Sequence, residues 1–464
     1  MYKYTSSGIY FIRQAVLRMS DAQKNPLLDE SGGTDHLKEV CRDPAFREAV
    51  LCASESLYHS MNDYLDDNIK DARRKRQIEL SLSQYWMRMT TRATPFGLFS
   101  FVGMGDMSHS CKTEKNIRVL IDADYEWIWS FSKSLEKQGL QELSFASNGL
   151  ISEQRTYFSL PYTPGCSGDS PVKIKKTALI SSLLKRCKNE VCSYRDLRSS
   201  FSKNDPEMDG SDFDEVLREL LKKDFLISEL RPLLSSPNLL QAMIAQLKTK
   251  SSLAGISKQL EVVASQMEYV SEHVFEKDAE RHLLNIIHLM RDMNAAPHVI
   301  KTDLINEGDS DLLDKNDIKE LEKFADFFVT AVACSQSRFT IYDEYKDSFQ
   351  NTYGDFQLVQ LSKMLDEQKG IGLPFEYKES RKKRKGIKVS PISITTEIMQ
   401  YAISKYREAI QNNTPIQTED LLPLIDKLNP MGAFPTSFDM IFRLAFDDDG
   451  RRIFICNRDF GCIG

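Results

Sequence analysis

The sequence lacks any run of about 18 apolar residues, the length that an α-helix needs to cross a bilayer. Its first residues, Met1–Gly8, are polar and do not contain the apolar segment of a signal peptide. The nine cysteines are an odd number at irregular spacings, which argues against a disulfide framework. These absences favour a cytoplasmic protein with reduced thiols and no transmembrane segment. Such a protein can still associate peripherally with a membrane through its partners.

The sequence also lacks the motifs of self-contained catalysis. It has no His-Glu-x-x-His, no paired Cys-x-x-Cys, no EF-hand loop, no Gly-x-x-x-x-Gly-Lys phosphate loop and no dinucleotide fingerprint. His282 and His288 are six residues apart in a predicted helix, which places them on different faces. We therefore expect no metal and no cofactor. If the chain is an enzyme, its co-substrate must supply the activated bond.

What is present is typical of a folded protein with more than one hydrophobic core, since the chain has 464 residues. Hydrophobic residues make up 41% of it and charged residues 28%. The formal net charge of −6 does not indicate a general nucleic-acid binder, so RNA would need a local basic patch. Arg73–Arg76 and Arg381–Lys385 are two such patches, of which we interpret the second as an exposed, solvated loop.

The hydrophobic pattern predicts an α+β fold, with mixed sheets and helices in several domains. Apolar residues three and four apart predict helices at residues 34–66, 73–89, 126–136, 238–294, 316–349 and 396–411. Asp43-Pro44 opens one of these helices, and Asp122 or Asp124 caps another. Short β-branched, aromatic or alternating runs predict strands at residues 9–17 (buried), 98–102, 117–122, 156–160, 299–304, 438–445 and 452–456.

The stretch 176–235 has a pattern of its own. Helices at 176–187, 193–201 and 212–223 precede a strand at 225–230, which is the order of a winged helix-turn-helix. We therefore divide the chain into residues 1–160, an inserted winged-helix element at 161–235, and residues 236–464.

Arg88, Arg92 and Thr94 are close together where a predicted helix ends before Pro95. Arg88 and Arg92 are four residues apart, so their guanidinium groups share one helix face. Adjacent like charges repel, and an anion is one natural compensation because the planar guanidinium fork suits phosphate. The spacing alone favours the other compensation, in which both arginines pair with acidic residues of a neighbouring element.

A resemblance to a known family changes that weighting. The segment Tyr85–Phe99 (YWMRMTTRATPFGLF) resembles the motif near the start of lantibiotic dehydratases. Other segments resemble family landmarks in the same order along the chain: Asp43–Ser54, Phe225–Pro232, Tyr353–Gly372 and Phe434–Phe438. The resemblance covers nearly the whole chain.

The resemblance implies an activity that needs no nucleophile of its own. Such enzymes move glutamate from glutamyl-tRNA to Ser or Thr hydroxyls of a ribosomally made precursor peptide, and a separate domain then eliminates the glutamate. By this resemblance the acylation-site residues are Arg88, Arg92, Thr94, Asp122 and Asp303. For Asp122 and Asp303 the alternatives are a helix cap and a strand-end salt bridge.

The resemblance also implies partners. The winged-helix element would bind the leader of the precursor peptide, which adds a strand to a sheet edge. The charge of the basic run Arg73–Arg76, rather than the resemblance, suggests a contact with the backbone of glutamyl-tRNA, and the alternative is a solvated charged face. The other expected partners are a separately encoded elimination domain or cyclase and a second copy of the chain in a homodimer.

The chain departs from the family in length. Family members continue beyond the position that corresponds to Gly464, and the elimination domain is absent, so we expect that this polypeptide alone does not complete dehydration. Three interpretations stay open: one piece of a split enzyme, a relative that resembles a peptide aminoacyl-tRNA ligase, or an inactive truncated remnant. A hypothesis of another class is a peptide-binding module without catalysis.

Overall fold

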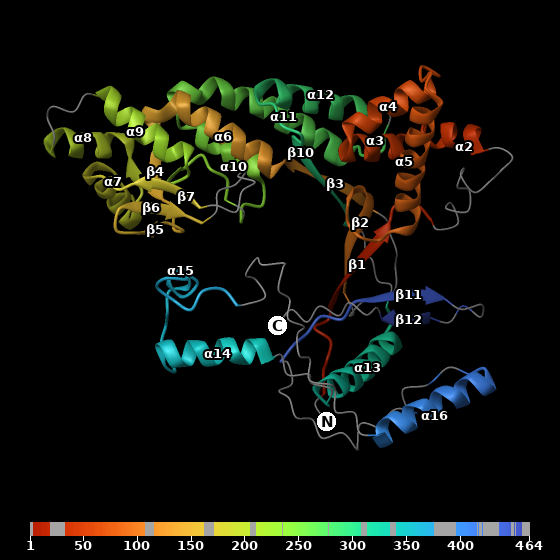
Figure 1. The fold of residues 1–464 in the computed structure, drawn as a ribbon. Coiled ribbons are helices and arrows are strands. Elements are labelled where there is room, and N and C mark those ends of the chain that lie inside the picture. Colours follow the sequence, from red (N-terminus) through yellow and green to blue (C-terminus); the bar gives the residue numbers. More distant parts are fainter. Residues whose placement is uncertain are drawn as a thin grey trace. The chain divides into compact units, whose positions relative to one another are not determined.

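The computed structural model describes residues 3–18, 33–106, 116–161, 171–204, 210–233, 235–276, 278–307, 313–334, 340–374, 396–414, 416, 420, 436–446, 450 and 452–456. The chain forms two compact units (Figure 1). Unit 1 contains Met1–Ile9, Asp106–Cys111 and Asp311–Gly464, and unit 2 contains Tyr10–Gly105 and Lys112–Ser310. Both predicted domain boundaries, after residues 160 and 235, fall inside unit 2.

A four-stranded mixed sheet lies at one end of unit 2. Its strands, in spatial order, are β1 (Ile9–Ala15), β2 (Gly97–Asp106), β10 (Ile300–Asn306) and β3 (Ile117–Ala123). β10 is parallel to β2 and antiparallel to β3. The expectation of a buried first strand was wrong: β1 is an edge strand, and Phe11 is 73% exposed. A short apolar run does not reveal how many neighbours a strand has.

Four helices lie between β1 and β2 along the chain: α2 (Gly33–Val40), α3 (Pro44–Ala53), α4 (Glu55–Leu65) and α5 (Ala72–Thr91). Asp43 caps α3 by accepting a hydrogen bond from the Phe46 amide, and Pro44 occupies the first turn, as the sequence predicts. Ser54 ends α3 and also caps α4. Arg92, in an extended conformation, ends α5 before the predicted Thr94-Pro95 turn.

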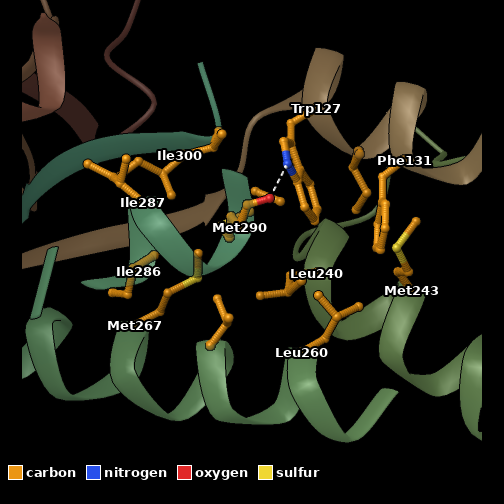
Figure 2. Packing of buried hydrophobic residues seen from close by; sticks show 14 of the residues in the cluster. Trp127, Phe131, Leu240, Met243, Leu260, Met267, Ile286, Ile287, Met290 and Ile300 are labelled. Carbon is orange, nitrogen blue, oxygen red and sulfur yellow. Dashed lines mark hydrogen bonds between the residues drawn. The ribbon is translucent and has the colours of Figure 1, made fainter. Parts of the chain in front are cut away.

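The main core of unit 2 lies between four further helices (Figure 2). These are α6 (Tyr125–Gly139), α10 (Leu239–Lys248), α11 (Ala254–Glu272) and α12 (Ala279–Met293). Trp127 is fully buried there, and its Nε1 donates to the carbonyl oxygens of Met290 at 3.1 Å and Asn294 at 2.8 Å. The polar edge of the largest core side chain is thus satisfied, as burial requires.

The predicted three-helix element has its helices at α7 (Ala178–Asn189), α8 (Tyr194–Asn204) and α9 (Gly210–Lys222). They accompany a three-stranded sheet of β8 (Cys192–Ser193), β4 (Ser144–Ser147) and β9 (Leu226–Ser228), in that order. The central strand β4 comes from before residue 161, where the sequence-based boundary stood. A second sheet contains β5 (Ser152–Glu153), β6 (Tyr157–Leu160) and β7 (Val172–Lys175).

Unit 1 contains α13 (Lys315–Cys334), α14 (Thr340–Tyr353), α15 (Leu361–Met364), α16 (Thr396–Asn412) and a hairpin of β11 (Phe442–Phe446) and β12 (Arg452–Cys456). Arg452 ties the hairpin to the start of α13 through Asp314 at 2.7 Å and Asp317 at 2.6 Å. The basic run Arg381–Lys385 lies outside the described residues, as do Phe434 and Pro435 of the segment Phe434–Phe438. None of the helices that are described combines the length and the apolar character needed to span a bilayer.

The four cysteines whose side chains are described carry free thiols: Cys41, Cys52, Cys187 and Cys192. Burial raises the pKa of Cys41, Cys52 and Cys187 to about 12, so these thiols stay protonated near neutral pH.

Glu48 on α3 is a buried carboxyl with a consequence for stability. Its side chain is fully buried, Oε2 accepts from the Phe275 amide at 3.0 Å, and Oε1 has no partner among the described residues. Burial raises the pKa of Glu48 from 4.5 to about 7. Because the folded chain holds this proton more tightly than the unfolded chain, the free energy of unfolding should fall as pH rises from about 4.5 to 7.

Glu48→Gln should remove this part of the pH dependence. Urea unfolding at pH 5 and pH 8 gives the change in the free energy of unfolding between the two pH values. This change should be smaller in the variant than in the unsubstituted chain by roughly 1–3 kcal/mol. Glu272→Gln, at an exposed glutamate of α11, is the matched control. Equal pH dependence in Glu48→Gln and the parent chain would contradict the assignment.

Candidate active site

The end of α5 and the turn after it bring the predicted arginines to one place. Arg88 lies in the last turn of α5, and the Arg92 amide donates to the Arg88 carbonyl as the helix ends. The Ser100 hydroxyl then donates to the Thr94 carbonyl at 2.8 Å, which fastens the turn to β2. Gly97 has a φ of +52°, a conformation that suits glycine, and lets the chain enter β2 directly.

A cleft of about 590 Å³ opens beside this turn. Its lining combines polar and aromatic side chains of α5 and the turn: Ser83, Gln84, Tyr85, Met87, Arg88, Thr91, Arg92 and Phe96. Thr94 is exposed but is not among the lining residues. The structure thus brings two of the three motif residues to the cleft, with the third in the adjoining turn.

Arg88 is held by an aromatic ring. The guanidinium carbon lies 4.3 Å from the centroid of the Phe96 ring, and Nε is buried without a hydrogen-bond partner among the described residues. In the part of the chain that the structure describes, no carboxylate pairs with Arg88 or Arg92. The acidic pairing that the spacing alone favoured is therefore not seen there, and both charges can meet an anion.

Aromatic packing fixes the ring that holds Arg88. The rings of Tyr85, Phe96 and Phe99 cluster, with Tyr85–Phe99 centroids 5.2 Å apart and Phe96–Phe99 centroids 5.9 Å apart. Phe99 is fully buried, while Phe96 is 40% exposed at the cleft. Sequence reasoning did not single out Tyr85 or Phe96, although Tyr85 precedes Arg88 by one helical turn and Phe96 belongs to the motif.

Asp122 lies elsewhere and caps a helix. Its carboxylate accepts from the amides of Leu239 at 2.6 Å and Leu240 at 2.9 Å, at the start of α10. Asp124 is the residue that caps α6, so the sequence-based alternative between the two is resolved in favour of Asp124. Asp122 is not among the residues that line the cleft.

Asp303 lies on β10, opposite Gly97 of β2 in the sheet register. Its carboxylate pairs with Lys301 at 2.7 Å, and both side chains are well exposed. The pair is the strand salt bridge that the sequence left as an alternative, and a surface pair of this kind contributes little to stability. Asp303 adjoins the strand that leaves the arginine turn, and its part in acylation stays a prediction, as does that of Asp122.

A second cavity, of about 380 Å³, lies where α3 meets α4, beside α12. Glu55 and Arg291 line it and pair with each other at 2.5 Å, and His59 lies 3.4 Å from Glu55. No sequence motif predicted this cavity, because its walls come from segments far apart along the chain. Among the residues described, no group of three or more histidine, cysteine or acidic side chains is placed to hold a metal ion.

The fold and the motif around this cleft define a member of a dehydratase family. Residues 42–451 match the profile of the family "Lantibiotic dehydratase, N terminus", and the chain belongs to this family.

Two curated relatives are lantibiotic biosynthesis proteins. The chain is 26% identical over 428 residues to the subtilin biosynthesis protein SpaB of Bacillus subtilis, covering 90% of this chain and 40% of SpaB. It is 27% identical over 394 residues to the nisin biosynthesis protein NisB of Lactococcus lactis subsp. lactis, covering 84% of this chain and 39% of NisB. The chain therefore spans about 40% of the length of these relatives.

Two solved structures share the fold. The tRNA-dependent lantibiotic dehydratase MibB from Microbispora sp. 107891 matches with a TM-score of 0.71 and 20% identity, over 94% of this chain and 41% of MibB. The glutamylation domain of TbtB from thiomuracin biosynthesis matches with a TM-score of 0.53 and 14% identity, over 91% of this chain and 53% of that one. At these identities the likeness shows a common fold of helices and small sheets.

Proposed function

We propose that the chain supplies the N-terminal part of an enzyme that transfers glutamate from glutamyl-tRNA to Ser or Thr of a ribosomally made precursor peptide. The observation that carries the proposal is the cleft in which Arg88 and Arg92 stand without acidic partners among the described residues, on the motif of the family. The ester arrives activated, so the protein has to align the peptide hydroxyl with the ester carbonyl and stabilise the oxyanion. Guanidinium donors serve both tasks and need no cofactor.

Within this proposal the five predicted residues have different tasks. Arg88 and Arg92 contact the charged end of the tRNA, and Thr94 offers an exposed hydroxyl in the adjoining turn. Asp303 adjoins the turn from the neighbouring strand. Asp122 acts indirectly, by holding the start of α10 against β3.

The solved neighbours support the tRNA and the glutamyl group as substrates. MibB is a tRNA-dependent lantibiotic dehydratase. The TbtB glutamylation domain was also solved bound to 5'-phosphodesmethylglutamycin, and this complex matches the chain with a TM-score of 0.52. A compound with a phosphate is the kind of ligand that two adjacent guanidinium groups suit.

We also propose that α7, α8 and α9 with the β8-β4-β9 sheet are a winged-helix-like element that binds the leader of the precursor peptide. Both outer strands of this sheet are edges of two or three residues, and an extended peptide can add to such an edge through main-chain hydrogen bonds. A DNA-binding role is disfavoured because α9 carries several acidic residues that repel phosphate: Asp212, Asp214, Glu215 and Glu219.

A peptide-binding module without catalysis is the second candidate function, and the observation that favours it is the β8-β4-β9 sheet, whose outer strands have no further strand beside them in the described residues. One experiment separates the two. The chain, with the products of the genes adjacent to its own, is mixed with a precursor peptide of that locus, tRNA, glutamyl-tRNA synthetase and labelled glutamate. The proposal predicts labelled peptide, and no labelled peptide when the tRNA is digested with ribonuclease before the reaction. A bound but unlabelled peptide would indicate the binding module.

Phe96 should matter to this transfer through Arg88. Phe96→Leu removes the ring under the guanidinium, so the rate at saturating glutamyl-tRNA should fall about 5- to 30-fold, which corresponds to the loss of one oriented cation–π contact at a partly desolvated site. Phe96→Tyr keeps a ring and should retain most of the rate. Single-turnover transfer assays measure both, and equal rates for Phe96→Leu and Phe96→Tyr would contradict this role.

A further inference from the structure

Helix α5 has a charge composition unlike that of the whole chain. From Arg73 to its C-cap Arg92 it carries six basic residues and one acidic residue, Glu79, whereas the full sequence has 61 basic and 67 acidic residues. A local excess of positive charge in an acidic protein marks a surface for a polyanion.

Four of these six basic side chains lie on one exposed face of α5. The opposite face is buried through Ile78, Leu82, Trp86 and Met89. The exposed positions are Arg73, Arg74, Arg76, Gln77, Leu80, Gln84 and Thr91, followed by Arg92. No acidic residue belongs to this face, because the Glu79 side chain is only 15% exposed and approaches Arg76 at 3.7 Å.

The arginines at the N-terminal end of α5 are available for a ligand. In the described part of the chain no carboxylate pairs with Arg73 or Arg74. Lys75 is directed inward, with its Nζ 5.6 Å from the centroid of the Tyr64 ring, and does not contribute to the face. Arg73 and Arg74 thus provide positive charge at one end of the helix, as Arg88 and Arg92 do at the other.

The spacing of these two arginine pairs suits a single nucleic-acid strand. A rise of 1.5 Å per residue puts Arg73 and Arg92 about 28 Å apart along the axis, which several successive phosphates can span. At the C-terminal end, the exposed ring of Phe96 and the neighbouring Tyr85 offer aromatic surface for a base. Basic side chains along a track with aromatic rings at one end are typical of single-strand binding surfaces.

We infer that the exposed face of α5 (Figure 1) is the track that holds the single-stranded 3′ end of an RNA, with the terminal nucleotide in the cleft and the preceding backbone against Arg73 and Arg74. This inference rests on the proposed function and adds the surface that holds the RNA strand. It also sets a direction, since the reactive end lies at Arg88 and Arg92.

The test compares a long and a short RNA probe. The long probe is a tRNA acceptor-stem minihelix with its single-stranded 3′ end, and the short probe is the dinucleotide CpA. Arg73→Gln with Arg74→Gln should weaken minihelix binding about tenfold and reduce the slope of log K against log salt by roughly 0.7 per arginine. The same double variant should bind CpA as the parent chain does, because CpA reaches only the cleft. Fluorescence anisotropy and NMR titration measure the two affinities.

The matched control is Lys185→Gln with Arg281→Gln, which removes the same charge from exposed positions of unit 2 and should change neither affinity. Unchanged minihelix affinity and salt slope in the α5 variant would overturn the inference. So would an equal loss of CpA binding, or tighter binding of polyglutamate than of the minihelix.

Failure of the proposed function gives a different result. RNA binding that depends on Arg73 and Arg74, without any transfer of glutamate, would sustain the track and overturn the transferase. Glutamate transfer that depends on Arg92, together with RNA binding that does not depend on Arg73 and Arg74, would support the transferase and overturn the RNA track.

Discussion

Arg92→Ala should lower tRNA-dependent transfer of glutamate to the precursor peptide by at least about 100-fold, the size of effect seen when one preorganised donor to a developing oxyanion is lost. Arg92 is exposed, lies outside the hydrophobic core, and ends α5 through its backbone amide, so its side chain can be shortened without loss of packing. Arg92→Lys should be intermediate, because an ammonium group keeps the charge but not the planar fork. Single-turnover transfer from labelled glutamyl-tRNA measures the rate.

The control for this prediction is binding of a fluorescently labelled leader peptide, which should be the same for Arg92→Ala and the parent chain. Loss of leader binding together with transfer would point to a folding defect. A transfer rate within threefold of the parent chain would contradict the assignment of Arg92.

Arg231→Ala should lower the free energy of unfolding by about 3–5 kcal/mol, the cost of leaving buried charges without their partner. Arg231 follows β9 and is only 2% exposed at its side chain. It pairs with Glu136 of α6 at 2.6 Å and with Asp224 before β9 at 3.1 Å, and its guanidinium carbon lies 4.6 Å from the centroid of the Trp129 ring. This network ties the three-helix element to α6, so the substitution acts where the two meet.

Arg231→Met with Glu136→Leu provides the matched comparison. Replacing both partners by apolar residues removes the unpaired Glu136, while Asp224 keeps its pair with Lys133 at 3.0 Å, so the double variant should recover most of the loss. Urea unfolding gives both free energies. A loss below about 1 kcal/mol in Arg231→Ala, the range of a surface ion pair, would contradict the buried-network account.

Local signals in the sequence predicted several boundaries of helices and strands. Asp43-Pro44 starts α3, the Thr94-Pro95 turn follows the end of α5, and β12 has the predicted bounds Arg452–Cys456. Each depends on residues within a few positions of one another, which a single sequence records.

Long-range features were not predictable in this way. Asp122 caps α10 more than 100 residues further along the chain, and β4 completes a sheet whose other strands lie at Cys192–Ser193 and Leu226–Ser228. The exposed edge position of β1 likewise depends on which strands pair, and pairing partners are not encoded in a short apolar run.

At the candidate site, too, local sequence predicted some features and not others. Helical spacing correctly put Arg88 and Arg92 at one place, and both line the cleft. The Phe96 ring that holds Arg88, and the absence of a carboxylate beside the pair in the described residues, required the three-dimensional structure.

The central claim is that Arg88 and Arg92 bind the charged end of the tRNA. Calorimetric titration with 5'-phosphodesmethylglutamycin, the compound bound in a TbtB complex, tests it most directly. We predict saturable binding that Arg88→Ala and Arg92→Ala each weaken at least about tenfold, as expected for loss of a charge-assisted hydrogen bond, and that Arg291→Ala in the second cavity leaves unchanged. Binding that ignores both motif arginines, or that depends on Arg291 instead, would contradict the account.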